Sequence, residues 1–156
     1  MNIRNPREYC ENVIWIRDKR QKLVQLKFKP AQPTLYEAIK KELQEGRPPR
    51  IIDLKGRQQG ISTITEALMF QDSATRPMVN TLIVAHRDDS TAALFNMNKL
   101  FYDYLPAKLQ PMKKASNAKE LVFENPTRDP AEKRKRPGLR SRIRCITAGG
   151  RAPAEA

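Results

Sequence analysis

The fold is decided by residues 50–63, which read RIIDLKGRQQGIST. Residues 50–55, where Ile51, Ile52 and Leu54 stand among charged residues, predict a short β-strand. Residues 56–61 are polar and bounded by glycine, which predicts a loop, and a helical pattern begins at Ser62. Because the backbone N–H groups at the start of a helix can donate to phosphate oxygens, this strand, loop and helix could bind a phosphate group.

The loop departs from the usual phosphate-binding pattern G-x-x-x-x-G-K-[ST]. Gly60 and Ser62 match its second glycine and its hydroxyl residue, but Lys55 replaces the first glycine and Ile61 replaces the lysine. Lys55 or Arg57 could reach in to supply the missing cation, and the Ser62 hydroxyl could ligate Mg²⁺. The alternative is a plain strand-to-helix turn that carries basic residues.

The rest of the chain predicts an α/β fold around this loop. Apolar residues at helical spacing predict three helices, at residues 34–45, at residues 62–74 and in the segment that ends at Pro106. Runs typical of strands occur at residues 13–28 (a hairpin), 81–85, 120–124 and 142–147. The order strand, loop, helix, strand, helix is typical of a parallel sheet flanked by helices.

Three segments of the chain carry more specific structural predictions. Residues 81–85 are wholly apolar, which predicts a strand buried on both faces. Asp88, Asp89 and Ser90 are candidates to cap the helix that follows. The basic run at 133–136 lies in a stretch rich in proline and charge, which predicts a flexible loop.

The 156-residue chain is strongly basic, with 30 Lys and Arg against 17 Asp and Glu and a net charge of +13. Such a charge suggests a polyanionic partner, most often nucleic acid, although it also occurs in proteins that are simply soluble. The two cysteines and the single histidine have no zinc-ligand spacing, and this cysteine usage is typical of a reducing compartment. No apolar run is long enough to cross a membrane, and the first residues do not resemble a signal peptide.

Several further segments occur in a specific order along the chain. They are Pro30-Ala31-Gln32 before a Leu-Tyr helix, Leu82-Ile83-Val84-Ala85-His86, Phe101-Tyr102-Asp103-Tyr104-Leu105-Pro106, Ser116-Asn117, Glu120-Leu121-Val122-Phe123 and Ile146-Thr147-Ala148. Together with the Arg-Gln pair, glycine and hydroxyl residues of 57–63, they resemble the ATPase domain of the large terminase subunit of tailed phages. The resemblance covers residues 8 to 150.

The resemblance implies an ASCE-type P-loop ATPase that drives viral double-stranded DNA into a capsid. ATP and Mg²⁺ would be the cofactors. The protein would be located in the cytoplasm of a phage-infected or lysogenic bacterial host. The small terminase subunit and the portal would be further partners of a completed motor. The nucleotide-binding residues implied are Gln32 (for adenine), Lys55, Arg57, Gln58, Gly60, Ser62 (also for Mg²⁺) and Thr63, while Lys133, Arg134, Lys135 and Arg136 would contact DNA.

The sequence also departs from that family. No apolar strand ending in Asp-Glu follows Thr147, and no nuclease domain is present in the 156 residues. We therefore expect a truncated ATPase in three parts: an N-terminal extension with a β-hairpin (1–30), an incomplete core (31–148) and a disordered tail (149–156). Such a chain would bind ATP without appreciable turnover.

Two other functions remain open. The first is a fragment of a P-loop helicase, although helicases usually keep a lysine directly before the hydroxyl residue, where this chain has Ile61. The second is a basic nucleic-acid-binding module without nucleotide chemistry.

Overall fold

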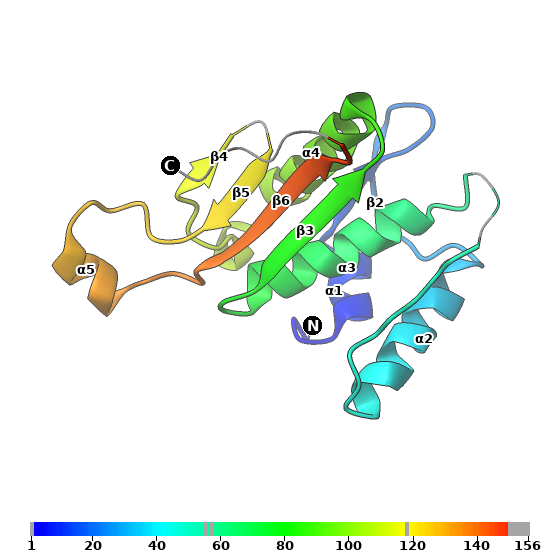
Figure 1. The fold of residues 1–156 in the computed structure, drawn as a ribbon, viewed down its shortest axis with the longest axis horizontal. Helices are drawn as coiled ribbons and strands as arrows, with labels where there is room; N and C mark the ends of the chain where they lie inside the picture. Colours follow the sequence, from blue (N-terminus) through cyan, green and yellow to red (C-terminus); the bar gives the residue numbers. More distant parts are fainter. Residues whose placement is uncertain (1, 55, 57, 118, 150–156) are drawn as a thin grey trace.

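The computed structural model is an α/β fold with two separate sheets (Figure 1). It describes residues 2–54, 56, 58–117 and 119–149. A two-stranded hairpin follows the first helix, and a four-stranded sheet lies at the centre. In chain order the elements are α1 (Pro6–Val13), β1 (Trp15–Arg17), β2 (Leu23–Gln25), α2 (Gln32–Gln44), α3 (Ile61–Thr75), β3 (Asn80–Ala85), α4 (Asp88–Asp103), η1 (Ala107–Leu109), β4 (Ala115–Ser116), β5 (Glu120–Phe123), α5 (Pro130–Lys135) and β6 (Ser141–Thr147).

The central sheet is mixed rather than parallel, with strand order β3-β6-β5-β4. β3 runs parallel to β6, with Ile83 opposite Cys145. β5 runs antiparallel to β6, and β4 antiparallel to β5. The chain leaves β5 and returns to β6 through an arm, residues 124–140, at one end of the sheet, so these two strands must run in opposite directions. The prediction of a parallel sheet is therefore correct for the β3–β6 pair and wrong for the other two pairs.

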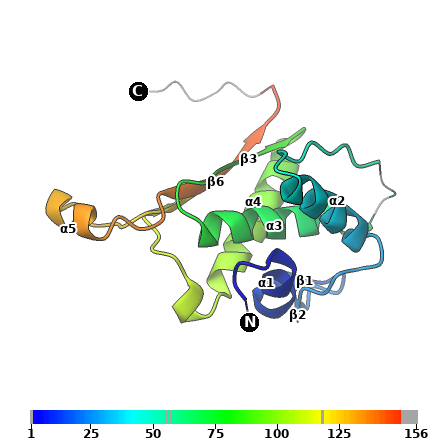
Figure 2. The ribbon, with the colours of Figure 1, turned by 90° about the horizontal axis from the view of Figure 1, so that it is seen from below.

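Helices cover one face of this sheet. Figure 2 shows α1, α3 and α4 on the same side of β3 and β6. On that side Ile83 is only 8% exposed, whereas Leu82 and Val84 on the other side of β3 are 54% and 55% exposed. The prediction that this strand is buried on both faces is wrong, because no described element packs against its second face.

Three aromatic rings fix α3 against its neighbours. Phe70 of α3 meets Phe101 of α4 and Phe123 of β5 edge to face, with ring centroids 5.6 and 6.1 Å apart. All three side chains are fully buried, and edge-to-face contacts add to the stabilisation that comes from burying them. The position of the first turn of α3, next to the predicted phosphate loop, therefore depends on the core.

The predicted hairpin is confirmed, but it is shorter than residues 13–28 because a helix precedes it. β1 and β2 pair with Trp15 opposite Gln25. The helix, α1, begins where the Asn5 side chain accepts a hydrogen bond from the Glu8 N–H at 3.2 Å, and Pro6 occupies its first position. Asparagine followed by proline is a helix-start signal that could have been recognised in the sequence.

The strand predicted at residues 50–55 is not formed in the part that the structure describes. The backbone groups of residues 48–54 make no hydrogen bond to another described residue, and Ile52 and Leu54 are completely exposed. Apolar character predicts a strand only if a neighbouring strand accepts its hydrogen bonds. The outer edge of β3 does not pair with this segment, because β6 is the only hydrogen-bonded neighbour of β3 among the described strands. Lys55, the last residue of the predicted strand, lies outside the described residues.

The helices predicted at residues 34–45 and 62–74 are confirmed as α2 and α3, with boundaries shifted by one or two residues. The flexible loop predicted around residues 133–136 instead contains the short helix α5. This helix forms because the Asp129 side chain accepts from the Ala131 N–H at 2.9 Å and Pro130 occupies the first position. The predicted tail, residues 149–156, lies outside the described residues except for Gly149.

Within the described part of the chain, no helix combines the length and the apolar character needed to cross a membrane.

Candidate phosphate site

The start of α3 leaves backbone donors free. Gly60 precedes the helix with φ +73° and supplies no side-chain cap. The first backbone bond of the helix runs from the Ile64 N–H to the Gly60 carbonyl at 3.1 Å. The N–H groups of Ser62 and Thr63 donate to no other described residue. Free N–H groups at the positive end of a helix dipole favour an anion.

Gln32 ties this loop to α2. Its amide nitrogen donates to the Gly60 carbonyl oxygen at 2.7 Å, and its amide oxygen accepts from the Lys29 N–H at 2.7 Å. The side chain is 1% exposed. Gln32 therefore links the loop to the Lys29 backbone through the two ends of its amide, a role that its place between two prolines did not indicate. Its predicted role in contacting adenine stays a prediction.

The hairpin reaches the same loop. Lys19, at the tip between β1 and β2, donates from Nζ to the Gln58 Oε1 at 2.7 Å. Gln58 itself has φ +62°, a left-handed conformation that is unusual outside glycine. The hairpin therefore places a lysine beside the predicted phosphate loop. Because 39 residues separate Lys19 from Gln58, local sequence patterns could not reveal this contact.

Of the other predicted nucleotide-binding residues, Ser62 and Thr63 lie in the first turn of α3. Ser62 is exposed, and its hydroxyl makes no hydrogen bond to another described residue. Magnesium in nucleotide sites often takes one or two protein oxygens and fills its other positions with phosphates and waters, so this hydroxyl fits the ion. No group of three potential metal ligands occurs among the described residues. Lys55 and Arg57 lie outside the described residues.

A polar cluster lies where β3 and β6 end. The Thr147 hydroxyl donates to the Asp88 Oδ1 at 2.5 Å and lies 2.8 Å from the Thr91 hydroxyl. Asp88 and Asp89 are in the first turn of α4, and Arg87 is the N-cap without a side-chain bond, so the prediction of an Asp or Ser cap is wrong. The carboxylates still favour the helix because they lie near its positive end.

A carboxyl group is buried between α3, α4 and β6. Glu66 is 4% exposed, and its Oε2 accepts from the Asn98 Nδ2 at 2.5 Å. Burial raises the pKa of Glu66 to about 7, although the bond from Asn98 lowers it. The Asn98 Oδ1 is also buried and accepts no hydrogen bond within the described residues.

The predicted DNA-binding residues lie far from the loop. Figure 1 shows α5 and the start of α3 at opposite ends of the molecule. Lys133 forms an ion pair with Glu124 at 3.0 Å, while Arg134, Lys135 and Arg136 are exposed. The structure therefore does not bring the two predicted sites together.

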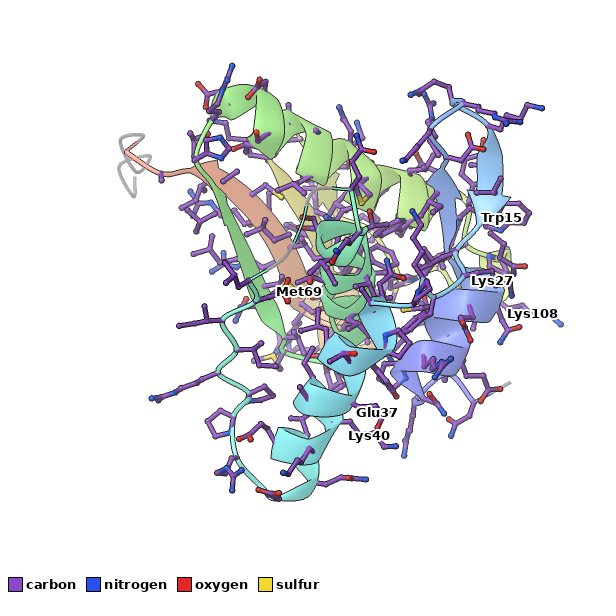
Figure 3. All side chains as sticks on the ribbon, turned by 90° about the vertical axis from the view of Figure 1, so that its right-hand side faces the viewer. Trp15, Lys27, Glu37, Lys40, Met69 and Lys108 are labelled. Carbon is purple, nitrogen blue, oxygen red and sulfur yellow. The ribbon has the colours of Figure 1, made fainter. Side chains whose placement is uncertain are left out.

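A large apolar cavity of about 700 Å³ lies between α2 and α3. α2 contributes Leu35, Ile39 and Leu43 to its lining, and α3 contributes Leu68 and Met69. Met69, labelled in Figure 3, belongs to the α3 side of this lining. On α2, Glu37 and Lys40 lie close together in the same view and form an ion pair at 3.5 Å. The apolar face of α2 is thus only partly buried, and Leu43 remains 59% exposed.

No protein-family profile matches the chain, and no curated protein matches it either.

Proposed function

We propose that this chain is the nucleotide-binding part of a phage terminase-like P-loop ATPase, and that residues 55–63 bind the phosphates of MgATP. As a 156-residue chain it would bind the nucleotide without appreciable turnover. The observation that carries the proposal is the start of α3, where left-handed Gly60 leaves the N–H groups of Ser62 and Thr63 without partners among the described residues. Both N–H groups can therefore donate to the oxygens of a bound phosphate.

Electrostatics adds support. Lys19 lies against Gln58, and the Lys29 side chain passes Gly60, with its Cδ 3.7 Å from the position of an added β-carbon. Two lysines therefore approach the loop from separate elements. No carboxylate is paired with either of them in the described structure, so their charge is available to an anion.

In the proposed complex, the Ser62 and Thr63 N–H groups donate to phosphate oxygens, and the dipole of α3 favours the negative charge. Lys55 and Arg57 would add cations at the start of the loop. The Ser62 hydroxyl would ligate Mg²⁺. When bound, Mg²⁺ neutralises negative charge on the phosphate oxygens. Gln32 keeps the loop in position through its bond to Gly60.

Replacing Lys55 with alanine should weaken MgATP binding about tenfold or more, because a hydrogen bond to a charged group contributes about 1.5–3 kcal/mol. Isothermal titration calorimetry of the purified chain measures this effect. Lys108→Ala removes an exposed lysine in η1, labelled in Figure 3, and should leave the affinity unchanged.

Two outcomes would contradict the proposal: a folded wild-type chain that gives no binding heat, or a Lys55→Ala chain that binds as tightly as the wild type. A phosphate-release assay on the same samples tests the expected lack of turnover.

A second candidate function is binding of double-stranded DNA by the arm at residues 124–140. The arm projects from the sheet in both Figure 1 and Figure 2, and it presents three exposed cations in a row. Cations on a projecting element can follow a phosphate backbone without reading its sequence.

Replacing Arg134, Lys135 and Arg136 together with alanine should weaken DNA binding and make its salt dependence shallower. The slope of log affinity against log salt should fall by about 2 to 3, because each phosphate contact contributes about 0.9. Fluorescence anisotropy with a labelled duplex at several salt concentrations measures both quantities. The matched control removes the same charge from the hairpin (Lys19, Arg20 and Lys22 to alanine). Equal losses in the two variants would mean that the net charge alone binds DNA and the arm has no special role.

A further inference from the structure

A second cavity lies beside the candidate phosphate site. Its volume is about 610 Å³, within the range of small-molecule sites. The hairpin forms one wall and α4 the other, and Thr63 in the first turn of α3 contributes to the lining. Since the Thr63 N–H is one of the free donors at the start of α3, the cavity adjoins the place proposed for the phosphates.

The walls of this cavity combine apolar surface with free amides. Ile16 of β1 faces Met97 and Leu100 of α4 across it, and all three are half-buried. Gln21 and Asn96 contribute exposed side-chain amides that make no hydrogen bond to another described residue. An apolar slot suits a flat ring, and amides can both donate to and accept from the polar edge of a heterocycle.

We propose that this cavity binds the base and ribose of the nucleotide whose phosphates lie at the start of α3. The inference rests on the proposed function and adds to it the position of the nucleoside. It assigns ring contacts to Ile16, Met97 and Leu100, and base-edge contacts to Gln21 and Asn96. In this arrangement Gln32 does not contact the base, because its amide already bonds to the loop and to Lys29.

The larger cavity between α2 and α3 suits a nucleotide less well. Its walls are mainly apolar, and the charges in its lining balance, with Asp53 and Asp72 against Lys40 and Arg76. The lining of the smaller cavity carries two cations, Arg17 and Lys99, and one carboxylate, Asp103, and Lys19 lies near the loop. The smaller cavity therefore has one cation in excess in its lining, which favours phosphates nearby more than the balanced lining of the larger cavity does.

The test compares MgATP with magnesium tripolyphosphate, which has phosphates and no nucleoside. Ala93 is an exposed residue of α4 that lines the cavity, so Ala93→Leu should fill part of it. Ala92 is also exposed but is not part of the lining, so Ala92→Leu is the matched control. Both substitutions lie on a helix surface, and circular dichroism checks that each variant is folded.

The wild type should bind MgATP about tenfold or more tightly than magnesium tripolyphosphate. Ala93→Leu should remove most of that difference without changing tripolyphosphate binding, and Ala92→Leu should behave as the wild type. The inference is overturned if the wild type binds both probes equally, or if Ala93→Leu and Ala92→Leu have the same affinity for MgATP. If neither probe binds, the phosphate loop itself is rejected and the nucleoside site with it, whereas tripolyphosphate binding alone rejects only the nucleoside site.

Discussion

Replacing Glu66 with glutamine is expected to stabilise the folded chain by roughly 3 kcal/mol at pH 8, since burial raises the pKa of this carboxyl from 4.5 to about 7. Above pH 7 the wild type must fold with a buried negative charge, and glutamine removes that charge. The new amide can also donate to the Asn98 Oδ1, which is buried without a partner among the described residues.

The sign of the pH dependence follows from the order in which the two states lose the proton. Below pH 4.5 Glu66 is protonated in both the folded and the unfolded chain, so its contribution to stability is fully present. Between pH 4.5 and about 7 the unfolded chain releases the proton first, and the free energy of unfolding falls. Asn98 from α4 and Cys145 from β6 face this carboxyl, and Cys145 stays a neutral thiol because burial raises its pKa to about 12.

Urea unfolding of the wild type and Glu66→Gln at pH values from 5 to 8 measures this effect. The difference in the free energy of unfolding between the two chains should grow with pH. Glu37→Gln is the control, because Glu37 is exposed on α2 (Figure 3). Parallel stability profiles of wild type and Glu66→Gln would show that Glu66 does not bind its proton more tightly in the folded state.

Replacing Gly60 with alanine should destabilise the fold by about 2 to 3 kcal/mol and abolish MgATP binding. The left-handed φ of +73° costs about 1–2 kcal/mol for a residue with a β-carbon. That carbon would also lie 2.7 Å from the Gln32 Nε2, so the buried amide would have to move and lose its bond to the loop. Moving the loop would misplace the free donors of α3.

Gly46→Ala separates the two causes. Gly46 has a similar φ of +70°, but an added β-carbon there meets no atom within 4 Å. This control should therefore show the backbone cost alone and bind MgATP normally. Thermal unfolding and calorimetry on both variants make the comparison. Equal destabilisation by the two substitutions would mean that the contact between Gln32 and Gly60 contributes little to stability.

Local patterns predicted much of the secondary structure. Helical spacing of apolar residues located α2 and α3, and short strand-like runs located β5 and β6, because these signals depend on neighbours in sequence. The run at residues 50–55 carries the same kind of signal, yet its described part forms no strand, since strand formation depends on a partner elsewhere in the chain. For the same reason the sequence did not show that Leu82 and Val84 are exposed.

The candidate site could be predicted only in part. Gly60, Ser62 and Thr63 follow from the loop pattern itself. The contacts that position the loop join distant residues: Gln32 to Gly60 and Lys19 to Gln58. A single sequence does not reveal such pairs, because each residue alone is typical of a surface or a turn.

The pairing of β3 with β6 has a consequence for synthesis on the ribosome. The sequence separation between Asn80 and Arg142, which face each other in this pair, is 62 residues. At about 5–20 residues per second, β3 waits roughly 3 to 12 seconds for its partner to be translated. During that time β3, an uncharged segment rich in strand-forming residues, has no hydrogen-bonded partner on either edge. It is then most prone to aggregate or to bind a chaperone.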